Sequence, residues 1–131
     1  MGWKFLEKEM KRGLAKITLN PKSLYKGAIG GYIAFNARAI SVLGLDLKAE
    51  QNERLINVAF NTDTRSYYIV VKVDKGFLVG KNHTLNNDQL RQHLCEAFKL
   101  DPTKKHTLYL DTNVITKANG HTAVLLTTKK Q

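Results

Sequence analysis

The sequence has few of the residues that would link it to an oxidising compartment, a zinc site or a membrane. Its single cysteine, Cys95, allows neither an intramolecular disulfide nor a cysteine-based zinc site. Its apolar stretches, such as Tyr67 to Val71, are far shorter than the roughly 20 residues that cross a bilayer. The first residues lack the apolar run of a secretory signal. We therefore expect a cytoplasmic protein with no membrane partner.

Acidic residues are also scarce, and this sets the expected class of partner. The 131 residues include 21 Lys and Arg but only 11 Asp and Glu, which gives a net charge of +10. The excess is segmental: the net charge is +5 over residues 1–27, +1 over 28–101 and +4 over 102–131. Separate basic segments flanking a nearly neutral middle favour a polyanionic partner, with nucleic acid as the first candidate.

Residues that could support catalysis are few and scattered. The four histidines, His83, His93, His106 and His121, include no pair at i, i+4, and none stands in a recognisable metal or nucleophile motif. Cys95 lies in an apolar helical pattern, where a small buried hydrophobe is expected rather than a thiolate. We therefore expect a protein that is not an enzyme and has no metal site and no cofactor.

The chain has two prolines and no low-complexity tract, so we expect a single domain over residues 1–131. The apolar spacing between Trp3 and Met10 predicts a short helix, and the alternation in Ala15–Leu19 predicts a strand. The expected segments are a basic arm with the first strand (1–27), a first structural unit (28–73), a second unit (74–127) and a basic tail (128–131).

The first unit has clear element boundaries. Tyr32–Phe35 is a strand candidate, Asn36 is a helix cap, and Gly44 ends the helix that follows. Arg54–Phe60 and Ser66–Val73 are strand patterns joined by five polar residues, which predicts a hairpin.

The second unit shows the same order of elements. A short strand is expected at Gly76–Gly80 and a helix at Gln89–Leu100, after cap candidates at 86–88. His106–Leu110 and His121–Thr127 are then strands joined by a polar loop. The sequence thus predicts an α+β fold made of two tandem β-α-β-β units.

The segments GYIAFNARAISVLGLD and LINVAFNTDTRSYYIVVKV, between Gly31 and Val73, resemble the AbrB/MazE/SpoVT swapped-hairpin family. The resemblance implies a barrel of interleaved strands, normally formed by a dimer, that grips DNA with basic residues of the first strand and the hinge-helix region. Two units in one chain could supply both halves of such a barrel. The arginine and the hinge proline typical of the family are missing here, since Tyr32 and Asn36 stand at those places.

Candidate DNA-contacting residues follow from the charge and from this resemblance. Arg38, Asn36 and Arg65 are the best candidates for contacts to base edges. The residues expected to contact phosphates are Lys16, Lys22, Lys26, Arg38 and Arg65, with Arg91 as the counterpart of Arg38 in the second unit.

The leading hypothesis is a non-enzymatic protein that binds double-stranded DNA, as a regulator or accessory factor of a bacterium or phage. It is expected to be a monomer with internal pseudo-symmetry if the two units pair within one chain, and a homodimer otherwise. A first alternative is a protein-interaction module, such as a phage-encoded inhibitor of a host protein. A second is a single-stranded nucleic-acid binder, in which bases stack on aromatic side chains. The aromatics considered are Tyr25, Tyr32, Phe35, Tyr67 and Tyr68.

Overall fold

The computed structural model describes residues 14–21 and 31–129, so the helix expected between Trp3 and Met10 lies outside the described residues. The described part contains an antiparallel sheet of eight strands, two α-helices and a 3-10 turn, which confirms the α+β class. The strands are β1 (Lys16–Asn20), β2 (Tyr32–Phe35), β3 (Leu55–Asn61), β4 (Ser66–Val71), β5 (Phe77–Leu78), β6 (Thr84–Leu85), β7 (His106–Ala118) and β8 (His121–Thr127). The helices are α1 (Ala37–Leu43) and α2 (Asp88–Ala97), and the 3-10 turn is η2 (Gln51–Arg54).

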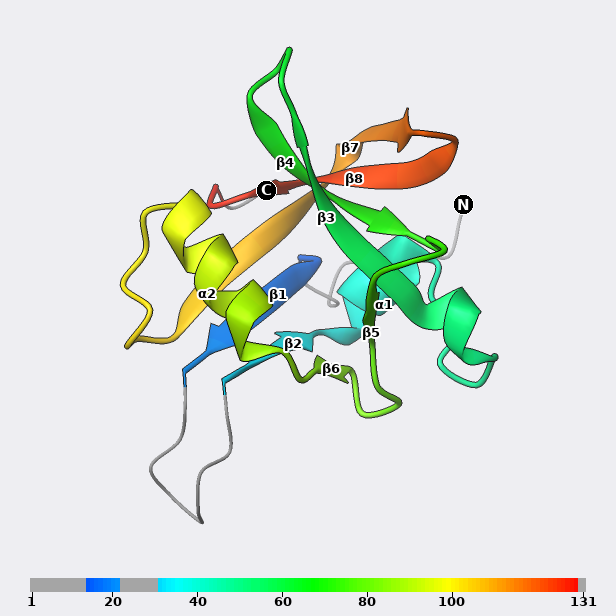
Figure 1. Cartoon of the computed structure of the whole chain (residues 1–131), viewed down its shortest axis with the longest axis horizontal. Helices are drawn as coiled ribbons and strands as arrows, with labels where there is room; N and C mark the ends of the chain where they lie inside the picture. Colours follow the sequence, from blue (N-terminus) through cyan, green and yellow to red (C-terminus); the bar gives the residue numbers. More distant parts are fainter. Residues whose placement is uncertain (1–13, 22–30, 130–131) are drawn as a thin grey trace, which may run out of the picture.

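The sheet curls into a nearly closed barrel. Its strand order is β5-β3-β4-β8-β7-β1-β2-β6, with every neighbouring pair antiparallel. Figure 1 shows α1 and α2 on opposite sides of this barrel. Between the two end strands, the Gly80 N–H donates to the Thr84 carbonyl at 2.8 Å. This bond links the segment after β5 to β6, so the two ends of the sheet are held close together.

The structure does not divide into the expected β-α-β-β units at 28–73 and 74–127. The second range contains an additional short strand, β6, before its helix. Strands of the two ranges are also interleaved, because β4 pairs with β8, β3 with β5, and β2 with β6. Neither range forms a sheet of its own. Sequence periodicity identified the elements but carried no information on which strands pair.

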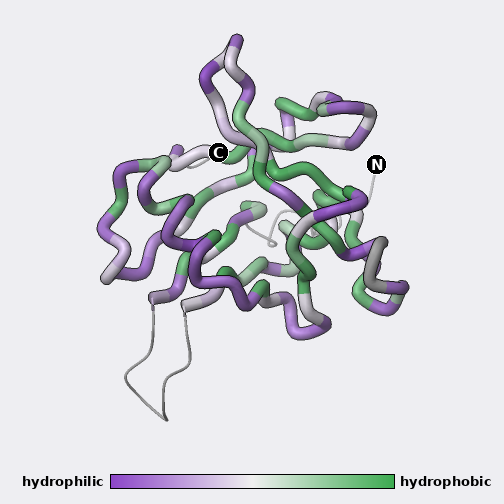
Figure 2. The backbone as a smooth tube through the Cα atoms, viewed as in Figure 1, coloured by the Kyte–Doolittle hydropathy of each residue, from purple (hydrophilic) through white to green (hydrophobic). Residues whose placement is uncertain are grey.

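The core lies inside the barrel and is closed by the two helices. Alternate residues of the strands point inward, among them Ile17, Leu108 and Val124, which are fully buried. α1 adds Ala39, Ile40 and Leu43, whereas α2 adds Leu90, Leu94 and Cys95. Figure 2 shows hydrophobic segments along the barrel strands and hydrophilic ones along α2 and the hairpin tips. In residues 14–21 and 31–129 no helix is long and apolar enough to cross a membrane.

Both expected helices are present, and the second is shorter than expected. Asn36 caps α1, and Gly44 ends it in the left-handed region with φ of 66°, as the sequence predicted. Asn87 caps α2, which ends at Ala97 rather than at Leu100. The Asn61–Arg65 turn joins β3 to β4. The Asn61 side chain stabilises this turn by accepting from the N–H groups of Asp63 and Thr64. The expected hairpin is therefore confirmed.

The last hairpin differs from its prediction. β7 continues through Ala118 for 13 residues, where a strand ending at Leu110 and a polar loop were expected. A bulge lies between Asp111 and Ile115, after which Thr116 to Ala118 pair with β8 again. The polar residues of this segment are consistent with a strand because they lie on an exposed two-stranded arm.

Candidate nucleic-acid interface

Asn36 ties the start of α1 to strand β1. Its Oδ1 accepts from the Ala39 N–H at 2.8 Å, which is the helix cap, and from the Lys16 N–H at 3.2 Å. Its Nδ2 donates to the Leu14 carbonyl at 2.7 Å, and its own N–H donates to the Lys16 carbonyl at 3.2 Å. The amide of Asn36 is thus engaged in holding two segments together. It is not available for the base-edge contact expected from the sequence.

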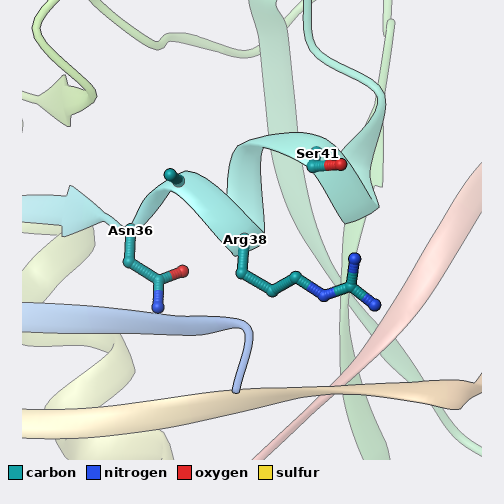
Figure 3. Close-up of a pocket in the computed structure, with 4 residues that line it drawn as sticks. Asn36, Arg38 and Ser41 are labelled. Carbon is teal, nitrogen blue, oxygen red and sulfur yellow. The ribbon is translucent and has the colours of Figure 1, made fainter. Parts of the chain in front are cut away.

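This junction joins the two segments that carry Lys16 and Arg38, two of the sequence-predicted cations. Lys16 is exposed at the start of β1, and Arg38 is the second residue of α1. Arg38 is half-buried and lines a cavity of about 500 Å³ together with Asn36, Ala37 and Ser41. Figure 3 shows its guanidinium extending along the helix and away from Asn36. Within residues 14–21 and 31–129 Arg38 forms no salt bridge, so its charge is not compensated there.

Lys16 belongs to a row of outward-facing residues that crosses the sheet. Lys16 pairs with Tyr109 on β7, and Tyr109 pairs with Thr127 on β8. Extending the Tyr67–Leu126 pairing by one residue places Ser66 of β4 beside Thr127. We call these four residues, Lys16, Tyr109, Thr127 and Ser66, the outer strip. Directly opposed residues point to the same face of a sheet, so the outer strip is continuous.

Arg65 lies at the far end of the outer strip. It precedes Ser66 in the tip of the β3–β4 hairpin, is exposed, and has φ of 56°. Three strand spacings of about 4.8 Å separate Ser66 from Lys16, roughly 14 Å along the sheet. Arg65 is therefore on the same side of the barrel as Lys16, but it does not cluster with Lys16 and Arg38. Lys22 and Lys26 lie outside the described residues.

Arg91 occupies a different environment from the one expected. It is only 3% exposed, and its Nε donates to Asp88 Oδ1 at 2.7 Å while Nη1 donates to the Pro102 carbonyl at 2.8 Å. This hydrogen bond from Arg91 is the main reason that the pKa of Asp88 lies below its usual value. Arg91 is thus held inside the protein by groups of its own chain. Gln89, and not Arg91, stands two residues after the Asn87 cap, as Arg38 stands after Asn36.

Sequence reasoning missed several polar residues on the outer face. Tyr109 lies beside Lys16, and Lys129 follows the outer strip directly, its N–H donating to Thr127 Oγ1 at 3.1 Å. Lys117 is exposed on the β7–β8 arm. The alternation of His106–Leu110 already placed Tyr109 outward. The position of Lys117 depended on the unexpected length of β7, and Lys129 had been assigned to a tail.

Of the five aromatic residues considered for base stacking, Tyr25 lies outside the described residues, and the other four are buried or half-buried. Phe35 and Tyr68 are buried, and Tyr67 packs against Phe60 and Phe98 with ring centroids 4.8 and 5.5 Å away. In residues 14–21 and 31–129 no three His, Cys, Asp or Glu residues are grouped as a metal site would require. Cys95 is fully buried, and burial raises the pKa of its thiol.

Comparisons with known proteins give no relative. The chain matches no protein-family model, no curated protein and no solved structure. Functional inference therefore rests on the geometry described above.

Proposed function

We propose that this chain is a non-enzymatic DNA-binding protein that contacts the phosphates of double-stranded DNA through Lys16, Arg38 and Arg65. The observation that carries the proposal is the Asn36 junction, which bonds the main chain of Lys16 to the start of α1, two residues before Arg38. Arg38 has no salt-bridge partner in the described part of the chain. Two cations on segments that are bonded to each other suit the closely spaced phosphates of a duplex.

The proposed surface includes the outer strip and the cavity beside α1. Tyr109, Thr127 and Ser66 supply hydroxyl groups between Lys16 and Arg65, and hydroxyls are common hydrogen-bonding groups toward phosphate oxygens. Two acids lie close to the proposed surface: Asp111 is half-buried two residues after Tyr109, and Asp63 is exposed in the same hairpin tip as Arg65. Asp111 Oδ1 accepts from the Asn113 N–H at 2.9 Å.

The same proposal includes a single-chain version of the swapped-hairpin barrel. In its support, all strand pairings except β1–β2 are preserved when β1, β2, β3 and β4 are exchanged with β5, β6, β7 and β8. The β1–β7 pair then corresponds to β5–β3, while β4–β8 and β2–β6 are each exchanged with themselves. Each half also has an asparagine-capped helix in the same place. One chain thus forms the whole barrel and acts in the cytoplasm as a regulator or accessory factor.

A titration of a fluorescent 20-base-pair duplex, followed by anisotropy at several NaCl concentrations, tests this function. Non-specific binding with a Kd on the order of micromolar is expected at low salt, and it should weaken steeply as salt rises. The double variant K16A/R38A should bind at least tenfold more weakly. The matched control is Lys99→Ala, which removes an exposed lysine just after α2. Absence of binding at low salt, or binding that salt leaves unchanged, would overturn the proposal.

A further inference from the structure

Strand β3 has a long unpaired edge. On one side it pairs with β4 from Ile56 to Asn61. On the other side it pairs with β5 only at Leu55 and Ile56. Residues Asn57 to Asn61 therefore have no strand partner on that side within residues 14–21 and 31–129.

The direction of the hydrogen bonds identifies the free main-chain groups. The Leu55 carbonyl accepts from Lys72 at 2.9 Å, so Leu55 and every second residue after it bond toward β4. The Arg54 carbonyl accepts from Val79 on the opposite side at 3.2 Å. By this alternation, Val58 and Phe60 direct their N–H and C=O groups to the open edge. The Val58 N–H meets only the side-chain oxygen of Asn57, at 2.8 Å.

This edge lacks the features that usually prevent strand association. Residues 57–61 contain no charge and no proline, and their register with β4 has no bulge. The free edge of β7 differs from that of β3 in its charge and in its regularity. It carries Asp111 and Lys117, and it is interrupted by the bulge between Asp111 and Ile115. Of these two free edges, only that of β3 is suited to pairing with another strand.

The residues of this edge are arranged symmetrically about Ala59, with the sequence Asn-Val-Ala-Phe-Asn. We infer that the edge binds a second copy of this chain, with the two β3 strands antiparallel about a twofold axis through Ala59. The main-chain N–H and C=O groups of Val58 then bond to those of Phe60 in the second copy. Asn57 lies opposite Asn61 of the second copy. The strand itself brings no charge into the contact, and one cation beside it is Lys117 of the β7–β8 arm, which shares a cavity with Ala59 and Phe60.

A cavity beside the edge fits this arrangement. It has a volume of about 290 Å³ and lies between the edge and the start of α2. Its lining residues are Asn57, Val58, Phe77, Asn87, Gln89, Leu90 and His93. In the proposed register, Phe60 of the second copy lies opposite Val58. Opposed residues point to the same face of a sheet, and Val58 lines this cavity, so Phe60 of the second copy would enter it. Phe60 is itself 46% exposed, so its side chain is accessible to a second copy.

Crosslinking through Ala59→Cys tests the register without reference to DNA. Residues opposed at a non-hydrogen-bonded antiparallel site have Cα atoms about 4.5 Å apart. That separation lies within the range of about 4.4 to 6.8 Å that a disulfide spans. Under mild oxidation by oxidised glutathione, A59C should form a covalent dimer at least tenfold faster than I115C. Ile115 is a fair control because it is 52% exposed on the β7 arm, and the native Cys95 is fully buried.

Sedimentation equilibrium supplies the second measurement. Phe60→Ala should weaken self-association about thirtyfold, as expected for removal of a central aromatic contact, whereas Ile115→Ala should leave it unchanged. Equal crosslinking rates for A59C and I115C, or a protein that stays monomeric at millimolar concentration, would overturn the inference. Neither result bears on DNA binding, so the two proposals can fail separately.

Discussion

The two helices begin alike but use their arginines differently. Asn36 caps α1 by accepting from Ala39 at 2.8 Å, and Asn87 caps α2 by accepting from Leu90 at 2.9 Å. After the first cap, Arg38 is half-buried at a cavity and has no salt bridge in the part of the chain that the structure describes. After the second, Arg91 is buried against Asp88.

The difference shows that an arginine early in a helix can serve two opposite purposes. Arg91 is four residues after its cap and points into the protein, where Asp88 and the Pro102 carbonyl compensate its charge. Arg38 is two residues after its cap, on a side where the described residues offer no carboxylate. Arg91 therefore contributes to stability, whereas DNA binding by Arg38 is our proposal, and variants at the two helices should separate these effects.

The largest loss of stability is expected from Gly31→Ala, which disturbs the Asp88–Arg91 ion pair of α2. A Cβ at Gly31 would collide with Asp88 Oδ1 and Arg91 Nε, and it would approach the Asn20 carbonyl to 2.9 Å. Breaking a buried ion pair costs about 3 kcal/mol or more, and we expect a loss of that size in urea unfolding. Gly80→Ala is the matched control, since its nearest contact is the side chain of Asn82. A loss no greater than that of the control would show that the ion pair tolerates displacement.

Arg91→Met should cost somewhat less, about 2 to 3 kcal/mol in the free energy of unfolding, because two hydrogen bonds from a charged group are lost. DNA affinity should stay within twofold of the wild type at a temperature where the variant is folded. A large loss of affinity in the folded variant would mean that Arg91 reaches the ligand after all.

Replacing each capping asparagine in turn should show how the starts of α1 and α2 differ. Asn87→Ala should cost about 1 kcal/mol, the usual value for a helix cap. Asn36→Ala should cost about 2 kcal/mol, because its side chain also bonds Lys16 and Leu14. It should also weaken DNA binding several-fold by releasing β1, which carries Lys16, from the start of α1, which carries Arg38. Thermal unfolding and anisotropy measure the two effects, and equal results for the two variants would remove the special role given to Asn36.

The pH dependence of stability should depend on Arg91. The hydrogen bond from Arg91 holds the pKa of Asp88 below its ordinary value of 3.8 in the folded protein. Ionised Asp88 therefore stabilises the fold above that value, and this contribution disappears as the pH falls through the lowered pKa. The stability difference between wild type and Arg91→Met should be full at pH 6 and shrink below about pH 4. A difference that is constant down to pH 2 would contradict this.

Much of the fold could be predicted from the sequence because local chemistry fixes it. Asn36 and Gly44 set the limits of α1, and polar turn formers mark the β3–β4 hairpin. The pairing of β4 with β8 and of β1 with β7 could not be predicted, since strand alternation shows which face is buried but not the neighbour. β6 was missed because two residues carry no periodicity.

The candidate site was only partly predictable, for similar reasons. Lys16, Arg38 and Arg65 could be identified as candidate cations, but only the Asn36 contacts show that the segments carrying the first two are joined. The sequence around Arg91 offers one distinguishing signal, Asp88 three residues earlier, at an ion-pair spacing that has no counterpart around Arg38. The burial of Arg91 depends on Pro102, eleven residues away, and on the space that Gly31 leaves beside Asp88.

The most direct test compares the salt dependence of duplex affinity in three proteins: wild type, K16A/R38A and Arg91→Met. Each phosphate contact contributes about 0.9 to the slope of log affinity against log salt. The double variant should therefore lower the magnitude of that slope by about 1.8, and Arg91→Met should leave it unchanged. If all three slopes coincide, or if only Arg91→Met alters the slope, Lys16 and Arg38 are not the residues that meet the phosphates.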